Sequence, residues 1–185
     1  ASDGNVYQIE KEICRDAIKP NTLKSECEIA DKTEKLLFPY ISGEHIVCTM
    51  PEEQLRTDYP CAYRYLLCFK DVLSNRDKGK REYEEWFAFG RSQALNIIGC
   101  KLLFPYIASS PHFVISEQKD LLFYNGYALV SNGMEDLLIV QKILRSKIFW
   151  YYIKHTSKPY GSDYYALAIL NNNADATGAG GKVTF

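Results

Sequence analysis

Apolar residues recur at two different spacings in the first part of the chain. Between Asn5 and Lys19 they fall close to every third or fourth position, which is the spacing of one face of a helix. We expect Pro20 to end this helix, because proline lacks a backbone N–H and clashes with the preceding turn. Lys35–Ile41 is instead a short, continuous apolar run rich in strand-forming residues, and it predicts a buried strand.

The residues that follow predict two helices and a loop. Thr49-Met50-Pro51-Glu52 has the form of a capping box, with a proline that the first turn of a helix tolerates. A second helix is expected from Asp58-Tyr59-Pro60 to about Leu73, with apolar side chains along one side. Asn75–Lys80 is polar and contains a glycine, so it predicts a loop.

The second half of the chain predicts strands joined by a tight turn. The aromatic-rich segment Glu85–Phe89 and the apolar run Lys101–Ile107 are each typical of a strand. Within Leu121–Val130, two further apolar runs flank Asn125-Gly126, the preferred dipeptide of a two-residue hairpin turn. We therefore expect a β-hairpin in this segment.

A long helix and a polar tail complete the chain. Ser131 or Asn132 can cap a helix from about Met134 to Ile153, whose first turn carries acidic residues that favour a helix N-terminus. Residues 171–185 are rich in asparagine and glycine and poor in large apolar side chains, so we expect a mobile tail.

These elements predict an α+β fold. A mixed or antiparallel sheet should contain the two Leu-Leu-Phe-Pro-Tyr strands, the aromatic strand and the β-hairpin near residues 121–130, with helices packed on it. The chain of 185 residues suits a single domain over residues 1–170, which can be divided into two lobes, 1–85 and 86–170.

Composition narrows the class of protein. With 46% apolar residues the chain can bury a core, and it has no run of 18 apolar residues that would span a membrane. The six cysteines lie mostly in apolar runs and form no Cys-x-x-Cys pair, as expected for free thiols, so we expect a cytoplasmic protein. The three histidines are far apart and lack the spacing of zinc ligands.

Charge is distributed unevenly along the chain. The formal net charge is only −1, but residues 1–60 carry a net of −5 and residues 61–185 a net of +4. Residues 141–162 contain five basic residues and no acidic one. A phosphate-binding face has this composition, and so has an ordinary solvated helix face.

The motifs of several enzyme classes are missing from this sequence. It contains no Asn-Pro-Pro-Tyr tetrapeptide to hold a flipped base, no Gly-x-Ser-x-Gly elbow and no Walker loop. The glycine-rich residues 178–181 follow no strand and open no helix, so they do not predict a nucleotide loop. We expect no catalytic residue, metal or cofactor in this chain.

Several motifs occur in an order that resembles a known family. Trp86-Phe87-Ala88-Phe89-Gly90-Arg91-Ser92-Gln93 is followed by Lys101–Ile107, then by Asn125-Gly126, a helix, and Thr156-Ser157-Lys158-Pro159-Tyr160-Gly161. This order resembles the TaqI-like C-terminal specificity domain, which follows the catalytic domain in adenine-specific DNA methyltransferases and in fused type II restriction-modification enzymes. The family has Leu-Asn-Ser in the helix, and this chain departs from it with Leu144-Arg145-Ser146.

The resemblance implies a target-recognition domain that binds double-stranded DNA and reads a short sequence. Catalysis would belong to an N-terminal methyltransferase domain of the parent chain, which would use S-adenosylmethionine, so this fragment would not be an enzyme by itself. The alternative is a protein-interaction or structural domain of the same kind of enzyme, with no direct DNA contact.

The candidate DNA-binding residues fall into three groups and one isolated lysine. Arginine can bind guanine and glutamine can bind adenine through paired hydrogen bonds, whereas lysine and serine bind phosphate. The groups are Arg76, Lys78, Lys80 and Arg81; Arg91, Ser92 and Gln93; and Lys154, Ser157, Lys158 and Tyr160; with Lys101 as the isolated lysine. The first two groups and Lys101 each have a plain structural alternative. These are an exposed loop for the first group, an internal ion pair or a turn for the second, and a residue at the edge of the core for Lys101. The aromatic cluster 149–152 is expected in the core.

Overall fold

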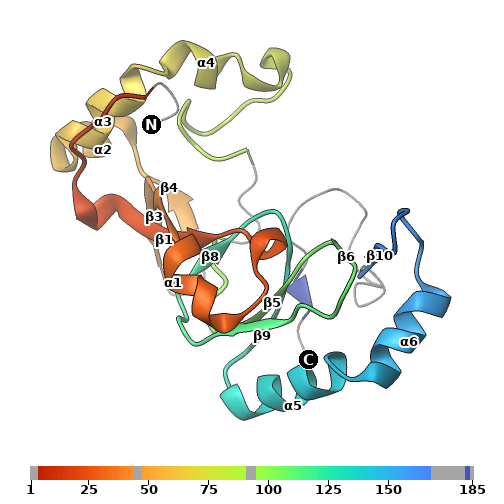
Figure 1. Ribbon diagram of the computed structural model, residues 1–185. Helices are drawn as coiled ribbons and strands as arrows, with labels where there is room; N and C mark the ends of the chain where they lie inside the picture. The colour runs from red at the N-terminus through yellow and green to blue at the C-terminus, as the bar shows by residue number, and fades with distance from the viewer. Residues whose placement is uncertain (1–3, 44–46, 91–94, 168–181, 184–185) are drawn as a thin grey trace. The chain divides into compact units, whose positions relative to one another are not determined.

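The computed structural model describes residues 4–43, 47–90, 95–167 and 182–183 (Figure 1). Helices and strands are both present, in mixed and antiparallel sheets, which confirms the expected α+β class. The chain divides into two compact units, and each is built from separate stretches of sequence. Unit 1 contains Ala1–Arg15 and Lys35–Asn96, and unit 2 contains Asp16–Glu34 and Ile97–Phe185. The two lobes expected from the sequence, 1–85 and 86–170, were each a single continuous stretch, unlike these units.

Unit 1 combines a short antiparallel strand pair with short helices around one apolar cluster. The cluster contains Ile13, Met50, Leu55, Ala62, Leu66 and Phe87. The elements of unit 1 are the 3-10 helix η1 (Lys11–Ile13), strands β3 (Tyr40–Ser42) and β4 (Val47–Thr49), helices α2 (Glu52–Asp58), α3 (Pro60–Leu67) and α4 (Lys70–Ser74), and the 3-10 helix η4 (Arg76–Gly79).

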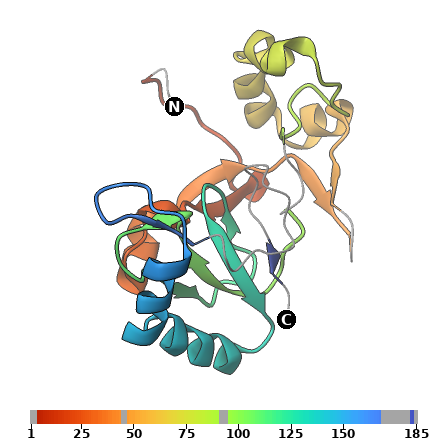
Figure 2. The ribbon, with the colours of Figure 1, turned by 90° about the vertical axis from the view of Figure 1, so that its right-hand side faces the viewer.

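Unit 2 is built on a sheet of strand order β11-β9-β5-β7. Strand β5 (Cys100–Phe104) is buried throughout and lies antiparallel to β7 (Val114–Ser116) and β9 (Tyr127–Ser131), and β11 (Lys182–Val183) runs parallel to β9. Helix α5 (Met134–Leu144) packs against this sheet, and α6 (Lys147–Thr156) follows it in a new direction (Figures 1 and 2). Strands β6 (Ile107–Ala108) and β10 (Tyr165–Ala166) pair antiparallel. Unit 2 also contains η2 (Pro20–Thr22), η3 (Glu26–Glu28) and α1 (Ile29–Lys32).

The helix expected between Asn5 and Lys19 is absent, and the prediction was wrong. After η1 the chain forms strand β1 (Cys14–Ile18), which lies between β2 (Glu34–Leu37) and β8 (Leu122–Phe123). Ala17 and Ile18 pair in parallel with residues of β8 and are buried. Pairing with a distant strand decides the conformation here, because the local spacing alone favours a helix weakly.

The two Leu-Leu-Phe-Pro-Tyr segments are each divided at their proline. The first forms β2 and β3, and the second forms β5 and β6, because proline has no N–H for the ladder. Strand β5 is buried, as expected for the second segment. Strand β2 of the first segment is not, since Glu34 and Lys35 at its start are exposed.

The helices of unit 1 begin without the expected capping box. Thr49 donates a hydrogen bond to the Glu84 carboxylate at 2.8 Å instead, and the N–H of Glu52 is satisfied by Glu85. The expected second helix is divided into α3 and α4, and α3 is capped by the carboxylate of Glu10, which accepts from the N–H groups of Cys61 and Ala62 at 2.8 and 2.9 Å. The polar segment after α4 forms η4.

Two strand predictions were also wrong. Glu85–Phe89 forms turns and bends, with Phe87 buried in the cluster of unit 1. Asn125-Gly126 does not close a hairpin, because β8 pairs with β1 and β9 pairs with β5. Gly126 is needed for packing, since a Cβ there would lie 2.4 Å from the Cβ of Pro20.

The long helix expected from Met134 to Ile153 is two helices. It breaks at Arg145-Ser146, where the Ser146 hydroxyl accepts the N–H of Phe149 at 3.1 Å and caps α6. Helix α5 is preceded by Gly133, whose N–H donates to the Ser131 hydroxyl. Of the tail at 171–185, all but residues 182–183 lies outside the described residues.

Candidate nucleic-acid interface

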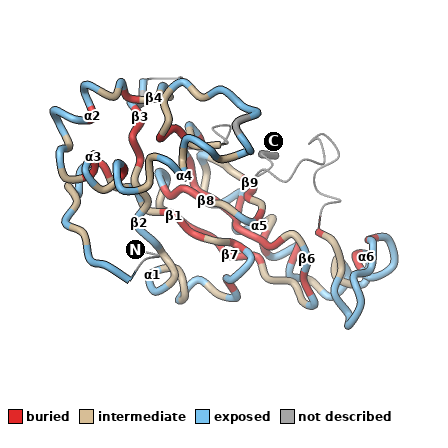
Figure 3. The backbone as a smooth tube through the Cα atoms, turned by 90° about the horizontal axis from the view of Figure 1, so that it is seen from above, coloured by how far each residue is buried: buried red, intermediate tan, exposed pale blue. Residues whose placement is uncertain are grey.

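Helix α6 turns a mixed cationic and aromatic face outward. Phe149, Trp150 and Ile153 pack into the apolar core of unit 2, which fixes the orientation of the helix. Because these three residues take the inner side, Tyr151 and Tyr152 are left exposed, at 66% and 49% of their surface. Figure 3 shows the exposed colour along α6 and the loop after it.

The loop after α6 carries the next lysine and tyrosine. At its start the N–H of Ser157 donates to the carbonyl of Ile153 at 2.9 Å, and the carbonyl of Lys158 accepts the N–H of Ala166 at 3.1 Å. The N–H of Tyr160 donates to the carbonyl of Tyr164 at 2.8 Å, and the Lys158 ammonium lies 5.4 Å from the centroid of the Tyr160 ring. Because the backbone is tied at both ends, Lys158 and Tyr160 are presented by an ordered loop.

We call these exposed side chains together the α6 surface. They are basic residues and aromatic rings on α6 and on the loop after it. The residues are Lys147, Tyr151, Tyr152, Lys154, His155, Lys158 and Tyr160.

The lysines of the α6 surface are not neutralised by acidic neighbours. Among the described residues, no ion pair involves Lys147, Lys154 or Lys158. The last turn of α6 carries Lys154 and His155, where a positive charge also interacts favourably with the helix dipole. Arg145 differs, because its guanidinium pairs with the Glu26 carboxylate at 3.0 Å. Three uncompensated ammonium groups therefore lie on one helix and its following loop.

The two arginines of the predicted basic loop, Arg76 and Arg81, contact other residues of unit 1. The guanidinium carbon of Arg76 lies 3.8 Å from the centroid of the Tyr83 ring, and Arg76 donates to the carbonyl of Trp86 at 3.3 Å. Arg81 donates to the carbonyl of Gly90. Only the two lysines of this group, Lys78 and Lys80, extend into solvent without such contacts in the described structure.

Lys101 is not on the surface, which corrects its place among the DNA-binding candidates. The residue is fully buried, and its ammonium donates to the carbonyl oxygens of Gly99 and Lys119 at 2.9 and 2.7 Å. Burial lowers the pKa of Lys101 from 10.5 to about 8, although nearby Asp120 opposes the change. Its ammonium cannot reach a phosphate without leaving this site.

Of the other candidates, one is buried and three lie outside the described residues. Ser157 is 8% exposed, and its buried hydroxyl has no hydrogen-bond partner among the described residues, so it is not presented to a phosphate. Arg91, Ser92 and Gln93 lie outside the described residues. The structure therefore brings together Lys154, Lys158 and Tyr160 from the candidate list, and adds residues 147, 151, 152 and 155.

The two tyrosines of α6 are residues that the sequence interpretation missed. The cluster 149–152 was expected in the core, but only Phe149 and Trp150 pack there. In a helix that starts after Ser146, the spacing of Phe149, Trp150 and Ile153 places them on one apolar side. The exposure of Tyr151 and Tyr152 on the other side could have been predicted from that spacing.

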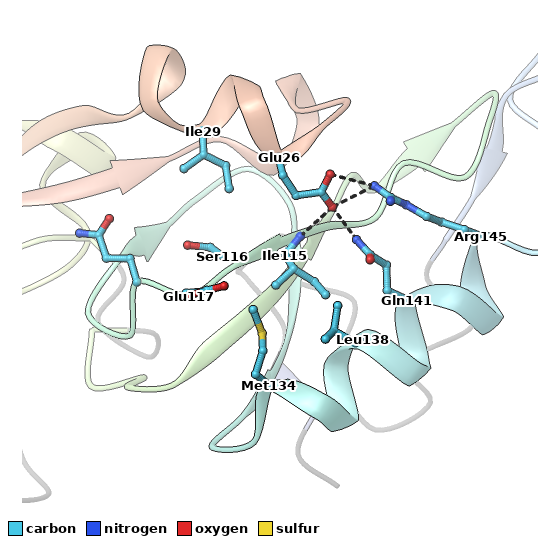
Figure 4. A pocket seen from close by; sticks show the side chains of 10 residues that line it. Glu26, Ile29, Ile115, Ser116, Glu117, Met134, Leu138, Gln141 and Arg145 are labelled. Atoms are coloured by element: carbon cyan, nitrogen blue, oxygen red, sulfur yellow. Dashed lines mark hydrogen bonds and ion pairs between the residues drawn. The ribbon is translucent and has the colours of Figure 1, made fainter.

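A separate cavity of about 570 Å³ lies elsewhere in unit 2, beside α5 (Figure 4). At one end the Glu26 carboxylate accepts from Gln141 at 2.6 Å, from Arg145 at 3.0 Å and from the N–H of Ile115 at 3.5 Å. Burial raises the pKa of Glu26, but these donors and the Arg145 charge outweigh it, so that the pKa lies below its ordinary value. Glu26 is therefore fixed as a structural anion joining η3 to α5 and β7.

Neither a metal centre nor a membrane span is found in the described segments. No group of three or more metal-binding side chains occurs in residues 4–43, 47–90, 95–167 and 182–183. None of the helices in that part of the chain combines the length and apolar character needed to cross a bilayer. No protein-family model matches the chain, and no curated protein is significantly similar to it.

Proposed function

We propose that this chain binds double-stranded DNA through the α6 surface. The observation that carries the proposal is the set of three uncompensated lysines, Lys147, Lys154 and Lys158, beside exposed tyrosines on one ordered helix and loop. Lysines bind phosphates and release counterions, whereas tyrosine hydroxyls and rings can contact sugar and phosphate groups. The overall charge of −1 does not oppose this, because the acidic excess lies in residues 1–60.

The finer proposal concerns the kind of protein. We propose that the chain is the target-recognition part of an adenine-specific DNA methyltransferase or restriction-modification enzyme of the cytoplasm, on the order of its motifs and its six free cysteines. Catalysis with S-adenosylmethionine would then belong to a partner domain. A glycine-rich cofactor turn and an Asn-Pro-Pro-Tyr motif encoded upstream would support this proposal, and an upstream region lacking both would refute it.

The DNA-binding proposal is tested by fluorescence anisotropy with a labelled duplex over a series of salt concentrations. The double variant K154M/K158M should bind about tenfold more weakly, and its logarithmic salt slope should be smaller by about 2, because two phosphate contacts are lost. The matched control is K11M/K119M, which removes two exposed lysines from elsewhere in the chain. Equal losses in both double variants, or no binding by the unaltered chain even at low salt, would refute the proposal.

A second candidate function is supported by the outer face of α5. Ile139 and Ile143 are both exposed, at 59% and 57%, and such apolar exposure favours contact with another protein. This is the protein-interaction alternative, with DNA held elsewhere. It predicts that I139S/I143S, and not K154M/K158M, abolishes association with the catalytic domain encoded with this chain.

A further inference from the structure

A second, more enclosed pocket of unit 2 has the chemistry of an anion site. It has a volume of about 410 Å³, and none of the described residues that line it is acidic. Apolar side chains from Leu23, Pro105, Ile107 and Ala108 form part of its wall. Its polar lining consists of Asn21, Lys24, Ser109, Ser110, His112 and Tyr164.

A serine and a histidine are directly joined in this pocket. Ser110 Oγ and His112 Nε2 lie 2.8 Å apart, and the N–H of His112 donates to the carbonyl of Ser110 at 2.9 Å. A nucleophilic triad would also need a carboxylate to orient the imidazole, and the described lining offers none. The pair is better suited to hold an anion, with a hydroxyl donor beside a ring that can become positively charged.

The charges around the histidine favour an anion in the pocket. Burial lowers the pKa of His112, and the positive charges of Lys24 and Arg145 lower it further, against an opposing effect of Glu28. Glu28 pairs with Lys32 at 2.9 Å and does not line the pocket, so its charge is partly neutralised. Arg145 is likewise paired with Glu26, at 3.0 Å. Lys24 lines the pocket and has no ion pair among the described residues, so its charge is the one that an incoming anion would meet.

The side-chain amide of Asn21 is already oriented by a hydrogen bond. The Asn21 side-chain oxygen accepts the N–H of Tyr106 at 3.0 Å, which leaves its amine as a donor toward a ligand. The pocket also adjoins the loop of the α6 surface, because Tyr164 lines the pocket and its carbonyl accepts the N–H of Tyr160 at 2.8 Å. A phosphate here would thus lie next to the proposed DNA-binding residues.

We propose that this pocket binds a phosphate group, held by Lys24, the Ser110–His112 pair and the Asn21 amine. The phosphate can belong to the DNA backbone, in which case the site rests on the proposed function and extends the α6 surface. It can equally be inorganic phosphate, which does not depend on DNA binding. Both sources present the same oxygen acceptors to the same donors.

The first experiment follows the ring resonances of His112 by NMR in the whole chain, with inorganic phosphate or with chloride at equal ionic strength. A bound phosphate should raise the pKa of His112 saturably, because the anion favours the charged imidazole. The Lys24→Met variant should weaken phosphate binding by about tenfold, as expected for a lost charged hydrogen bond. The control Lys119→Met, at an exposed lysine of the same unit, should leave it unchanged.

A pKa of His112 that is the same in phosphate and chloride would overturn the proposal, and so would equal effects of the two lysine variants. Ser110→Ala gives an independent check, since it removes a hydroxyl without altering charge and should weaken phosphate binding several-fold. A duplex titration then identifies the source. If Lys24→Met also weakens duplex binding and lowers the salt slope by about 1, the phosphate is part of DNA. If only inorganic phosphate binding is lost, the site takes the free anion.

Discussion

The burial of Lys101 makes a quantitative prediction about stability and pH. Its pKa is about 8 in the folded chain, against an ordinary value of 10.5 that we assign to the unfolded chain. One pKa unit corresponds to about 1.4 kcal/mol, so the difference amounts to about 3 kcal/mol of unfavourable charge burial. The penalty is fully present at neutral pH, where both states hold the proton.

The sign of the pH dependence follows from proton binding. Between pH 8 and pH 10.5 the unfolded chain holds a proton on Lys101 that the folded chain has lost. Stability therefore rises with pH in this window, whereas a methionine at the same position contributes no such rise. The difference in unfolding free energy between the unaltered chain and Lys101→Met should change by about 2 kcal/mol from pH 7 to pH 10.

Urea unfolding followed by circular dichroism at several pH values measures this difference. Titration of all other groups is shared by the two proteins and cancels in the comparison. Lys142→Met, which removes an exposed lysine of α5, serves as the control. Parallel pH profiles for the unaltered chain and Lys101→Met would show that the ammonium is not held in the buried site formed with the carbonyls of Gly99 and Lys119.

Three smaller predictions test the structure around the candidate surfaces. Glu26→Gln should lower the free energy of unfolding at neutral pH by less than about 1 kcal/mol, because the ion pair with Arg145 is partly exposed. The difference between the variant and the unaltered chain should vanish in acid, once the pH falls below the lowered pKa of Glu26, and urea unfolding from neutral to acidic pH measures it. Gly126→Ala should cost about 1–3 kcal/mol through the clash with Pro20, and a thermal midpoint equal to that of the unaltered chain would contradict the packing. Ser146→Ala should cost about 1 kcal/mol by removing the cap of α6, and should speed amide exchange in its first turn.

The predictions from sequence succeeded where a signal was local and strong. The β5 run was found because Leu102, Leu103 and Phe104 are consecutive apolar residues, and all three are buried. Strand β1 was missed because its conformation depends on pairing with β8, about a hundred residues further along the chain. Asn125-Gly126 misled for a similar reason, since the close approach of Pro20 requires the glycine.

The candidate surface was predictable only in part. The absence of acid from residues 141–162 is a matter of composition and is visible in the sequence. The exposure of Tyr151 and Tyr152 depends on the new helix that starts after Ser146, which a single long helix conceals. The ammonium of the buried Lys101 is held by the carbonyl of the nearby Gly99 and by that of Lys119, 18 residues further along the chain, and no pattern around Lys101 indicates the approach of Lys119.

Contact between the α6 surface and DNA can be observed residue by residue in an NMR titration of the isotope-labelled chain with a short duplex at low salt. We expect the backbone amide shifts to concentrate in residues 147–160 and to diminish as salt is added, because the contacts are mainly to phosphates. Shifts that are absent at low salt, or confined to the outer face of α5 around Ile139, would contradict it.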